Sequence, residues 1–198
     1  MILNKKKILD AINNPCNEPW THYVIDNVLN YDFTYEHEFI FNSSLYFQLL
    51  GEFDFIKKDI LDTYNPIRLT YKSTSGEKWE EPIKNTWARI RWLTSAPNAE
   101  QETHMDHYTK LWTLIIYCYG NTGTYLLDKN QEFSKEVKWV QNRGVIFAPG
   151  IKGIPTWHRV VNNSNKVRRV IALNIVSKDE DLKDPSKSFF SFQQIVSL

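Results

Sequence analysis

The stretch THMDHYTKLWTLIIYCY, residues 103–119, joins a short polar segment to a long apolar run. His104 and Asp106 stand two positions apart near its beginning. Residues 111–119 are rich in aromatic and β-branched side chains, which is typical of a buried strand. Side chains two positions apart project to the same side of an extended chain. We therefore expect His104 and Asp106 to face one cavity from the start of a strand.

A further histidine, His158, follows about fifty residues later. Two imidazoles and one carboxylate are the usual ligand set of a non-haem iron(II) site with open coordination positions. A strand that carries His158 beside residues 103–119 would bring the three side chains together. The sequence thus predicts that His104, Asp106 and His158 bind a metal and form the catalytic centre. His107 is adjacent, but strand alternation turns its side chain away from this set.

Arg168 and Arg169 come ten and eleven residues after His158. The segment NNSNK, residues 162–166, predicts a turn, and the strand that follows it would carry one of the two arginines beside the metal. A guanidinium inside a β cavity requires an anion, and a dicarboxylate co-substrate would pair with it in a bidentate manner. Alternation allows only one of the two to face inward. Arg168 is preferred because Ala172 and Asn174 share its face, and Arg169 is the alternative.

The remainder of the chain predicts helices first and strands afterwards. Apolar residues at helical spacing indicate helices over residues 4–13 and 45–64, and Asn65-Pro66 would end the second one. The period then changes to alternation, and turn signals separate roughly eight short strands. These predicted strands cover residues 67–72, 86–94, 111–119, 124–128, 137–140, 144–149, 157–161 and 167–176. This order is typical of a mainly β sandwich, jelly roll or barrel with a helical face.

Net charge and cysteine spacing limit the classes of partner and site that we expect. The chain has 198 residues with 24 basic and 23 acidic side chains, so its formal net charge is +1. This balance gives no reason to expect a nucleic-acid or membrane partner. Cys16 and Cys118 are far apart and match neither a zinc nor a redox spacing. We expect a cytoplasmic, reducing location, and a single domain over residues 1–198 with helical support (1–65), a β core (66–176) and a tail (177–198).

Three segments resemble the iron(II)- and 2-oxoglutarate-dependent oxygenases, most closely the prolyl-4-hydroxylase-like branch with its small bacterial and phage members. They are HMDHYTKLWTLIIYCYGNTGTYLL, NRGVIFAPGIKGIPTWHRVV and VRRVIALNIV, and the resemblance covers roughly residues 23–176. It implies a double-stranded β-helix, which is a cupin-like jelly roll with supporting N-terminal helices. It also implies Fe(II) at His104, Asp106 and His158, and 2-oxoglutarate paired with Arg168 or Arg169.

The implied activity is a dioxygenase reaction that hydroxylates a peptidyl or small-molecule substrate and releases succinate and CO2. Members of the family often use a Tyr or Thr from an earlier strand to help hold 2-oxoglutarate, and Thr113 and Tyr117 are candidates here. Related oxidations such as desaturation would use the same iron site. The alternative is a non-catalytic jelly roll of cupin type that binds a metal or a sugar. Succinate production from 2-oxoglutarate distinguishes the enzyme from the binding module.

Overall fold

The computed structural model describes residues 1–31, 43–63, 86–106, 110–148, 155–177 and 194–195. The predicted strand over residues 67–72 and the prediction for His107 fall outside these ranges. Within them, no helix has the length and apolarity that crossing a membrane requires.

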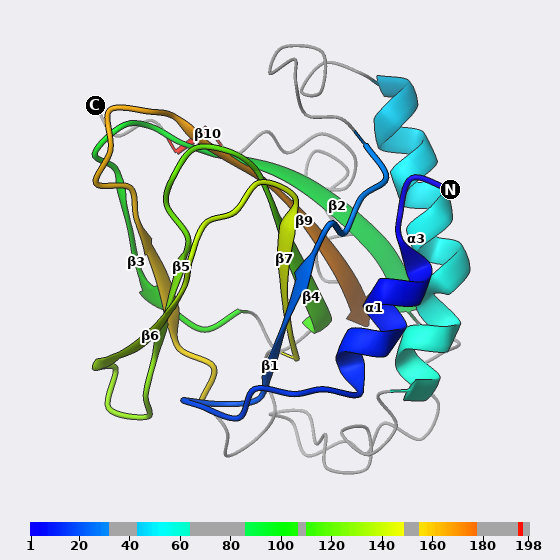
Figure 1. Cartoon of the computed structure of the whole chain (residues 1–198), viewed down its shortest axis with the longest axis horizontal. Helices are drawn as coiled ribbons and strands as arrows, with labels where there is room; N and C mark the ends of the chain where they lie inside the picture. Colours follow the sequence, from blue (N-terminus) through cyan, green and yellow to red (C-terminus); the bar gives the residue numbers. More distant parts are fainter. Residues whose placement is uncertain (32–42, 64–85, 107–109, 149–154, 178–193, 196–198) are drawn as a thin grey trace.

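In the described part of the chain, two helices precede most of the strands, as the apolar spacing predicts. Helix α1 spans Lys5–Ile12 and begins after Asn4, whose side chain accepts a hydrogen bond from the backbone N–H of Lys7. Helix α3 spans Ser43–Thr63. Both helices lie against one face of the larger sheet, at the right of Figure 1. The predicted helical support is therefore confirmed.

The larger sheet has six strands in the order β1-β7-β4-β9-β2-β10. Apart from the parallel pair of β10 and β2, its neighbouring strands run antiparallel. The strands are β1 (His22–Asp26), β2 (Thr86–Ser95), β4 (Lys110–Tyr119), β7 (Arg143–Phe147), β9 (Arg168–Ser177) and β10 (Gln194–Ile195). Both β1 and β10 lie outside the predicted β core, yet they belong to this sheet.

The smaller sheet has four strands in the order β3-β8-β5-β6. These strands are β3 (Glu100–His104), β5 (Thr124–Leu127), β6 (Phe133–Val137) and β8 (His158–Val161). The smaller sheet faces the side of the larger sheet that the helices leave open (Figure 1). Two facing antiparallel sheets with helices on one outer face confirm the predicted mainly β jelly roll.

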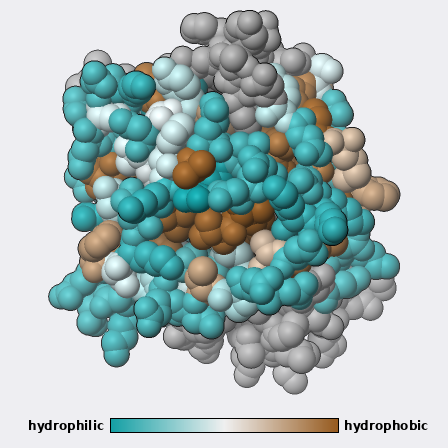
Figure 2. Space-filling view, viewed as in Figure 1, coloured by the Kyte–Doolittle hydropathy of each residue, from teal (hydrophilic) through white to brown (hydrophobic). Residues whose placement is uncertain are grey.

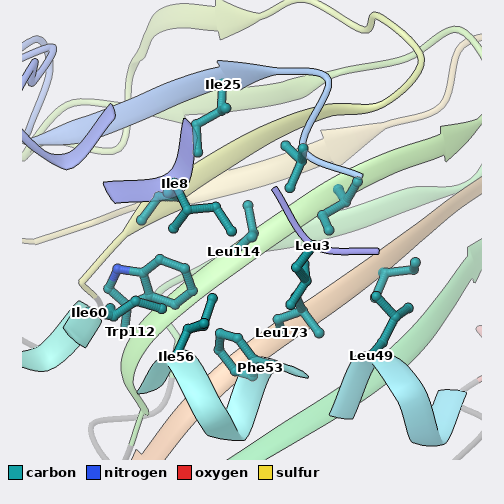
Figure 3. Close-up of a cluster of buried hydrophobic side chains, with 14 of the residues drawn as sticks. Leu3, Ile8, Ile25, Leu49, Phe53, Ile56, Ile60, Trp112, Leu114 and Leu173 are labelled. Atoms are coloured by element: carbon teal, nitrogen blue, oxygen red, sulfur yellow. The ribbon is translucent and has the colours of Figure 1, made fainter. Parts of the chain in front are cut away.

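Alternation along β4 separates two apolar layers. One face, which includes Trp112 and Leu114, packs against Phe53 and Ile56 of α3 and Ile8 of α1 (Figure 3). The other face turns toward the smaller sheet and supplies Ile115 and Tyr117 to a second cluster. A strand buried on both faces reads as a continuous apolar run, which explains the composition of residues 111–119. On the surface in Figure 2, hydrophilic side chains surround a smaller hydrophobic group.

Three local predictions are wrong. The sequence places a loop over residues 95–102, between the strands predicted over 86–94 and 111–119, but β3 begins at Glu100. The strand predicted over residues 137–140 is displaced, because β6 covers Phe133–Val137. Most of β6 is exposed, so its polar side chains give no apolar alternation to detect. Finally, His104 ends β3 and Asp106 lies in the connection to β4, so the pair does not open a strand.

Candidate metal centre

The three predicted ligands lie together between the sheets. One ligand atom from each of His104, Asp106 and His158 lies within 4.8 Å of the others. His104 and His158 are direct partners in the pairing of β3 with β8, and their ring centroids are 4.4 Å apart. The pairing is irregular between Gln101 and His104, at the point where the chain leaves the strand toward Asp106. The three residues are close together as the sequence predicts, but Asp106 reaches the histidines from the connection after β3 and not from a shared strand face.

Backbone hydrogen bonds fix the tautomer of both histidines. Nδ1 of His104 lies 2.9 Å from the carbonyl oxygen of Glu102, and Nδ1 of His158 lies 2.9 Å from that of Thr156. A carbonyl oxygen only accepts, so each Nδ1 carries the proton and donates it. The Nε2 lone pair of each ring is then available to a metal ion, and the carbonyl holds the ring in place.

Asp106 is held by two residues of β4. Thr113 donates a hydrogen bond of 3.0 Å to Oδ2 of Asp106, and Lys110 forms an ion pair with Oδ1. Asn174 on β9 extends this hydrogen-bond network, because its Nδ2 donates to the Thr113 hydroxyl over 3.1 Å. The network fixes the carboxylate although it lies outside a strand. Asn174 Oδ1 is buried and has no hydrogen-bond partner among the described residues, so this oxygen can accept a hydrogen bond from a ligand or a water.

The protonation states also suit a metal. Burial lowers the pKa of His158 to about 4, so its imidazole is neutral at physiological pH. Burial acts to raise the pKa of Asp106, but the charge of Lys110 and the hydrogen bonds from Lys110 and Thr113 act in the opposite direction, and that pKa lies below its usual value. Two imidazoles and one ionised carboxylate are the donor set that non-haem iron(II) sites use, and the fit to such an ion is good.

A cavity of about 260 Å³ adjoins these ligands. It approaches the small end of ligand pockets, which begins at roughly 300 Å³. Its walls come from both sheets. They include Arg91, Leu93, Thr94, Ser95, Gln101, His104, Met105, Asp106, Lys110, Thr113, Ile115, His158, Val160, Arg168, Val170, Ala172 and Asn174.

Arg168 enters this cavity and Arg169 does not line it. Arg168 is 3% exposed, its Nε donates to the carbonyl of Thr122 over 3.0 Å, and its guanidinium lies 5.5 Å from the ring centroid of Tyr117. The turn that carries Thr122 requires Gly120, whose φ of +123° places it in the left-handed region. The guanidinium is thus held from one side and keeps donors for an anion.

Thr113 and Tyr117, the two further residues predicted to help hold 2-oxoglutarate, lie in different surroundings. Thr113 lines the cavity, but its hydroxyl already joins Asp106 to Asn174. Tyr117 is fully buried, and its hydroxyl donates to Thr124 over 2.8 Å. Thr124 also accepts a hydrogen bond of 3.4 Å from Arg168, a role that sequence analysis missed. A short hydroxyl side chain at a strand start carries no signal of its own, so this contact depends on the sheet pairing.

The fold and this cluster together define a two-sheet jelly roll with a His-Asp-His centre. No family model matches the chain, and no curated protein sequence matches it. Solved structures do. A Pseudomonas putida prolyl-4-hydroxylase aligns with a TM-score of 0.59 at 11% identity, over 90% of this chain and 97% of that one.

Two further structures are similar. A prolyl 4-hydroxylase from Phytophthora capsici aligns with a TM-score of 0.55 at 15% identity, over 91% of this chain and 70% of that one. The viral collagen prolyl hydroxylase of Paramecium Bursaria Chlorella virus-1, solved with 2OG, aligns with a TM-score of 0.50 at 11% identity. This alignment covers 80% of this chain and 96% of that one. The chain therefore has the fold of these prolyl hydroxylases, which is the double-stranded β-helix that the resemblance implies.

Proposed function

We propose that the protein is an iron(II)- and 2-oxoglutarate-dependent dioxygenase that hydroxylates a peptidyl or small-molecule substrate. The observation that carries the proposal is the convergence of His104, Asp106 and His158 within 4.8 Å at a cavity that also contains a buried arginine. The fold shared with prolyl hydroxylases supports it. A single domain over the whole chain is supported by β1 and β10, which come from opposite ends and join one sheet.

In this proposal His104, Asp106 and His158 hold the iron(II). Bound iron would supply the centre at which 2-oxoglutarate, dioxygen and a substrate C–H bond react to give succinate, CO2 and the hydroxylated substrate. The Nε2 atoms of the two histidines and the Asp106 carboxylate would hold the ion and would leave coordination positions for these reactants. Thr113 and Asn174 keep the carboxylate oriented.

Arg168 binds the distal carboxylate of 2-oxoglutarate in this scheme. Its buried position places the charge where few competing waters reach it, which strengthens an ion pair. Tyr117 and Thr124 hold the guanidinium from behind, so they act as positioning residues. Arg169 remains the alternative that the sequence left open, and a cytoplasmic location remains a prediction from the sequence.

The test uses anaerobic protein mixed with iron(II) and 2-oxoglutarate. Chelation of the iron by the keto acid gives a weak visible charge-transfer band, and we expect it in wild type and not in His104→Ala or His158→Ala. Succinate release after oxygen is admitted separates a dioxygenase from a binding module. A wild-type protein without the band, or a band that survives both substitutions, would contradict the proposal.

A further inference from the structure

One hydrogen-bond acceptor in the cavity wall has no donor in the part of the chain that the structure describes. Asn174 lies on β9, lines the cavity and is 1% exposed. Its Oδ1 is buried, and no described residue donates a hydrogen bond to it. A buried amide oxygen that stays without a donor destabilises the folded protein, so a polar atom of this kind requires a water or a ligand as its partner.

The orientation of the Asn174 amide follows from its neighbours. The Thr113 hydroxyl has one hydrogen, which it donates to Oδ2 of Asp106 over 3.0 Å. Because an ionised carboxylate only accepts, the Thr113 oxygen is left as an acceptor for Nδ2 of Asn174, at 3.1 Å. The nitrogen end of the amide therefore faces Thr113, and Oδ1 lies at the opposite end, away from this network.

Along β9, Asn174 lies at the metal end of the cavity and Arg168 at the other end. Asn174 is the register partner of Thr113 on β4, and Thr113 contacts Asp106 directly. Arg168 stands at the start of β9 and lines the cavity on the same face of the strand. A group bound to Oδ1 would therefore lie near the reacting centre and apart from a carboxylate paired with Arg168.

Of the three proposed reactants, only the substrate can bring a hydrogen-bond donor to Oδ1. The 2-oxoglutarate dianion presents carboxylate and keto oxygens, which accept hydrogen bonds and do not donate them. Dioxygen has no hydrogen. The buried acceptor beside the proposed metal ligands therefore matches neither co-substrate.

We infer that Asn174 is a specificity-determining residue whose Oδ1 accepts a hydrogen bond from an N–H or O–H group of the substrate, close to the C–H bond that is hydroxylated. The role in substrate choice rests on the proposed function, whereas a donor-binding position at Oδ1 does not. A site with a buried acceptor discriminates strongly against an analogue that lacks the donor, because the acceptor is then left unpaired. The competing explanation is that Asn174 only holds Thr113, and that a water or Arg89, its register partner on β2, covers Oδ1.

The experiment compares small probes that differ only in a donor. N-methylacetamide has an N–H and N,N-dimethylacetamide has none, whereas isopropanol has an O–H that its methyl ether lacks. The protein is loaded with diamagnetic Zn(II) and saturated with 2-oxoglutarate, and saturation transfer to the methyl protons of each probe measures its binding. In at least one pair, we expect the probe with the donor to bind roughly 10-fold more tightly than its methylated partner. The pair with the larger preference identifies the donor as N–H or O–H.

A direct readout comes from protein that contains nitrogen-labelled asparagine. The side-chain amide resonances of Asn174 are assigned by their loss in Asn174→Leu. They should shift when the preferred probe is added and stay in place when its methylated partner is added. Asn174→Leu should also reduce the preference for the donor to less than about 2-fold. Asn174→Ala serves for the assignment and the comparison if Asn174→Leu fails to fold.

The matched control is Ser95→Ala, which removes a cavity-lining hydroxyl at the register position of Arg168. This variant should keep the preference for the donor. Equal binding of both members of each pair to wild type would overturn the inference and favour a water or Arg89 at Oδ1. A preference that survives in Asn174→Leu, or that Ser95→Ala loses to the same extent, would also overturn it, because the probe then binds elsewhere.

Calorimetric titration of the same samples with Zn(II) and 2-oxoglutarate separates this inference from the proposed function. If wild type binds neither, the proposed function fails, and the probe preference of the metal-free protein decides on the donor position at Oδ1. If wild type binds both while each probe pair shows equal affinity, the inference about Asn174 alone fails.

Discussion

His104 on β3 and His158 on β8 are register partners whose ring centroids lie 4.4 Å apart. Each ring is also anchored through Nδ1 to the carbonyl oxygen two residues before it. Two of the three proposed ligands are therefore oriented by strand pairing before any metal binds. Such preorganisation limits the entropy lost when an ion is captured.

Removal of either histidine should abolish tight metal binding. We expect His104→Ala and His158→Ala to weaken Mn(II) binding by more than about 100-fold, because loss even of a residue that only orients a ligand costs roughly 10- to 100-fold. Titration of the metal-free protein with Mn(II), followed by electron paramagnetic resonance of the free ion, measures this change.

His22 offers a matched control. It is fully buried, and its Nδ1 lies 2.8 Å from the carbonyl oxygen of Trp20, so its local geometry repeats that of the two proposed ligands. It does not line the cavity. His22→Gln should keep the Mn(II) affinity of wild type. Equal losses in His22→Gln and His158→Ala would indicate that the effect is on folding and not on coordination.

The buried state of His158 should make the metal-free protein sensitive to acid. The pKa of His158 falls from 6.5 to about 4 because burial disfavours the charged ring. Between these values the unfolded chain binds more protons, so stability is full above pH 6.5 and is lost as pH falls toward 4. The shift corresponds to a loss on the order of 3 kcal/mol.

Chemical denaturation with a chelator present, at pH 7 and at pH 4.5, measures this loss. His158→Gln removes the titrating ring, so the difference in the free energy of unfolding between the two pH values should shrink in that variant. An equal difference in wild type and His158→Gln would assign the acid sensitivity to other groups.

The sequence predicts the fold because periodicity and chemistry agree in most segments. The alternating run in residues 167–176 forms β9, with Ala172 and Asn174 on the cavity face and Leu173 under the helices. Proximity of His104, Asp106 and His158 follows from residue type and approximate spacing. The sequence does not predict the exposed strand β6 or the bulge next to His104, because both depend on pairing with a distant strand and leave no local pattern.

The ion pair between Lys110 and Asp106 should stabilise the metal-free protein. Loss of one partner of a buried pair leaves the other charge uncompensated, at a cost of about 3–5 kcal/mol. Lys110→Met should therefore lower the free energy of unfolding by that amount in the presence of a chelator. Mn(II) should raise the melting temperature of Lys110→Met more than that of wild type, because the ion then replaces the ammonium group that pairs with Asp106.

An exposed ion pair provides the comparison. Lys5 lies 2.6 Å from Asp59, and the two side chains are 34% and 46% exposed. Lys5→Met should cost less than about 1 kcal/mol, as exposed pairs do. A Lys110→Met variant that is no less stable than Lys5→Met would show that the pair of Lys110 and Asp106 is solvated and that Asp106 does not need a replacement cation.

The two adjacent arginines should differ sharply in their effect on 2-oxoglutarate. Arg168 lines the cavity and is almost fully buried, whereas Arg169 does not line it. Arg168→Met should weaken binding of 2-oxoglutarate to the Mn(II)-loaded protein by roughly 10- to 100-fold, which is the range for one or two hydrogen bonds to a charged group. Arg169→Met should change this affinity by less than about 3-fold. Arg168→Lys should recover part of it, because a charge remains but the bidentate guanidinium is lost.

Calorimetric titration of the three variants, with melting temperatures recorded to confirm folding, gives the ranking. A larger loss in Arg169→Met than in Arg168→Met would assign the co-substrate to the other face of β9 and would require a site that the cavity between the sheets does not contain.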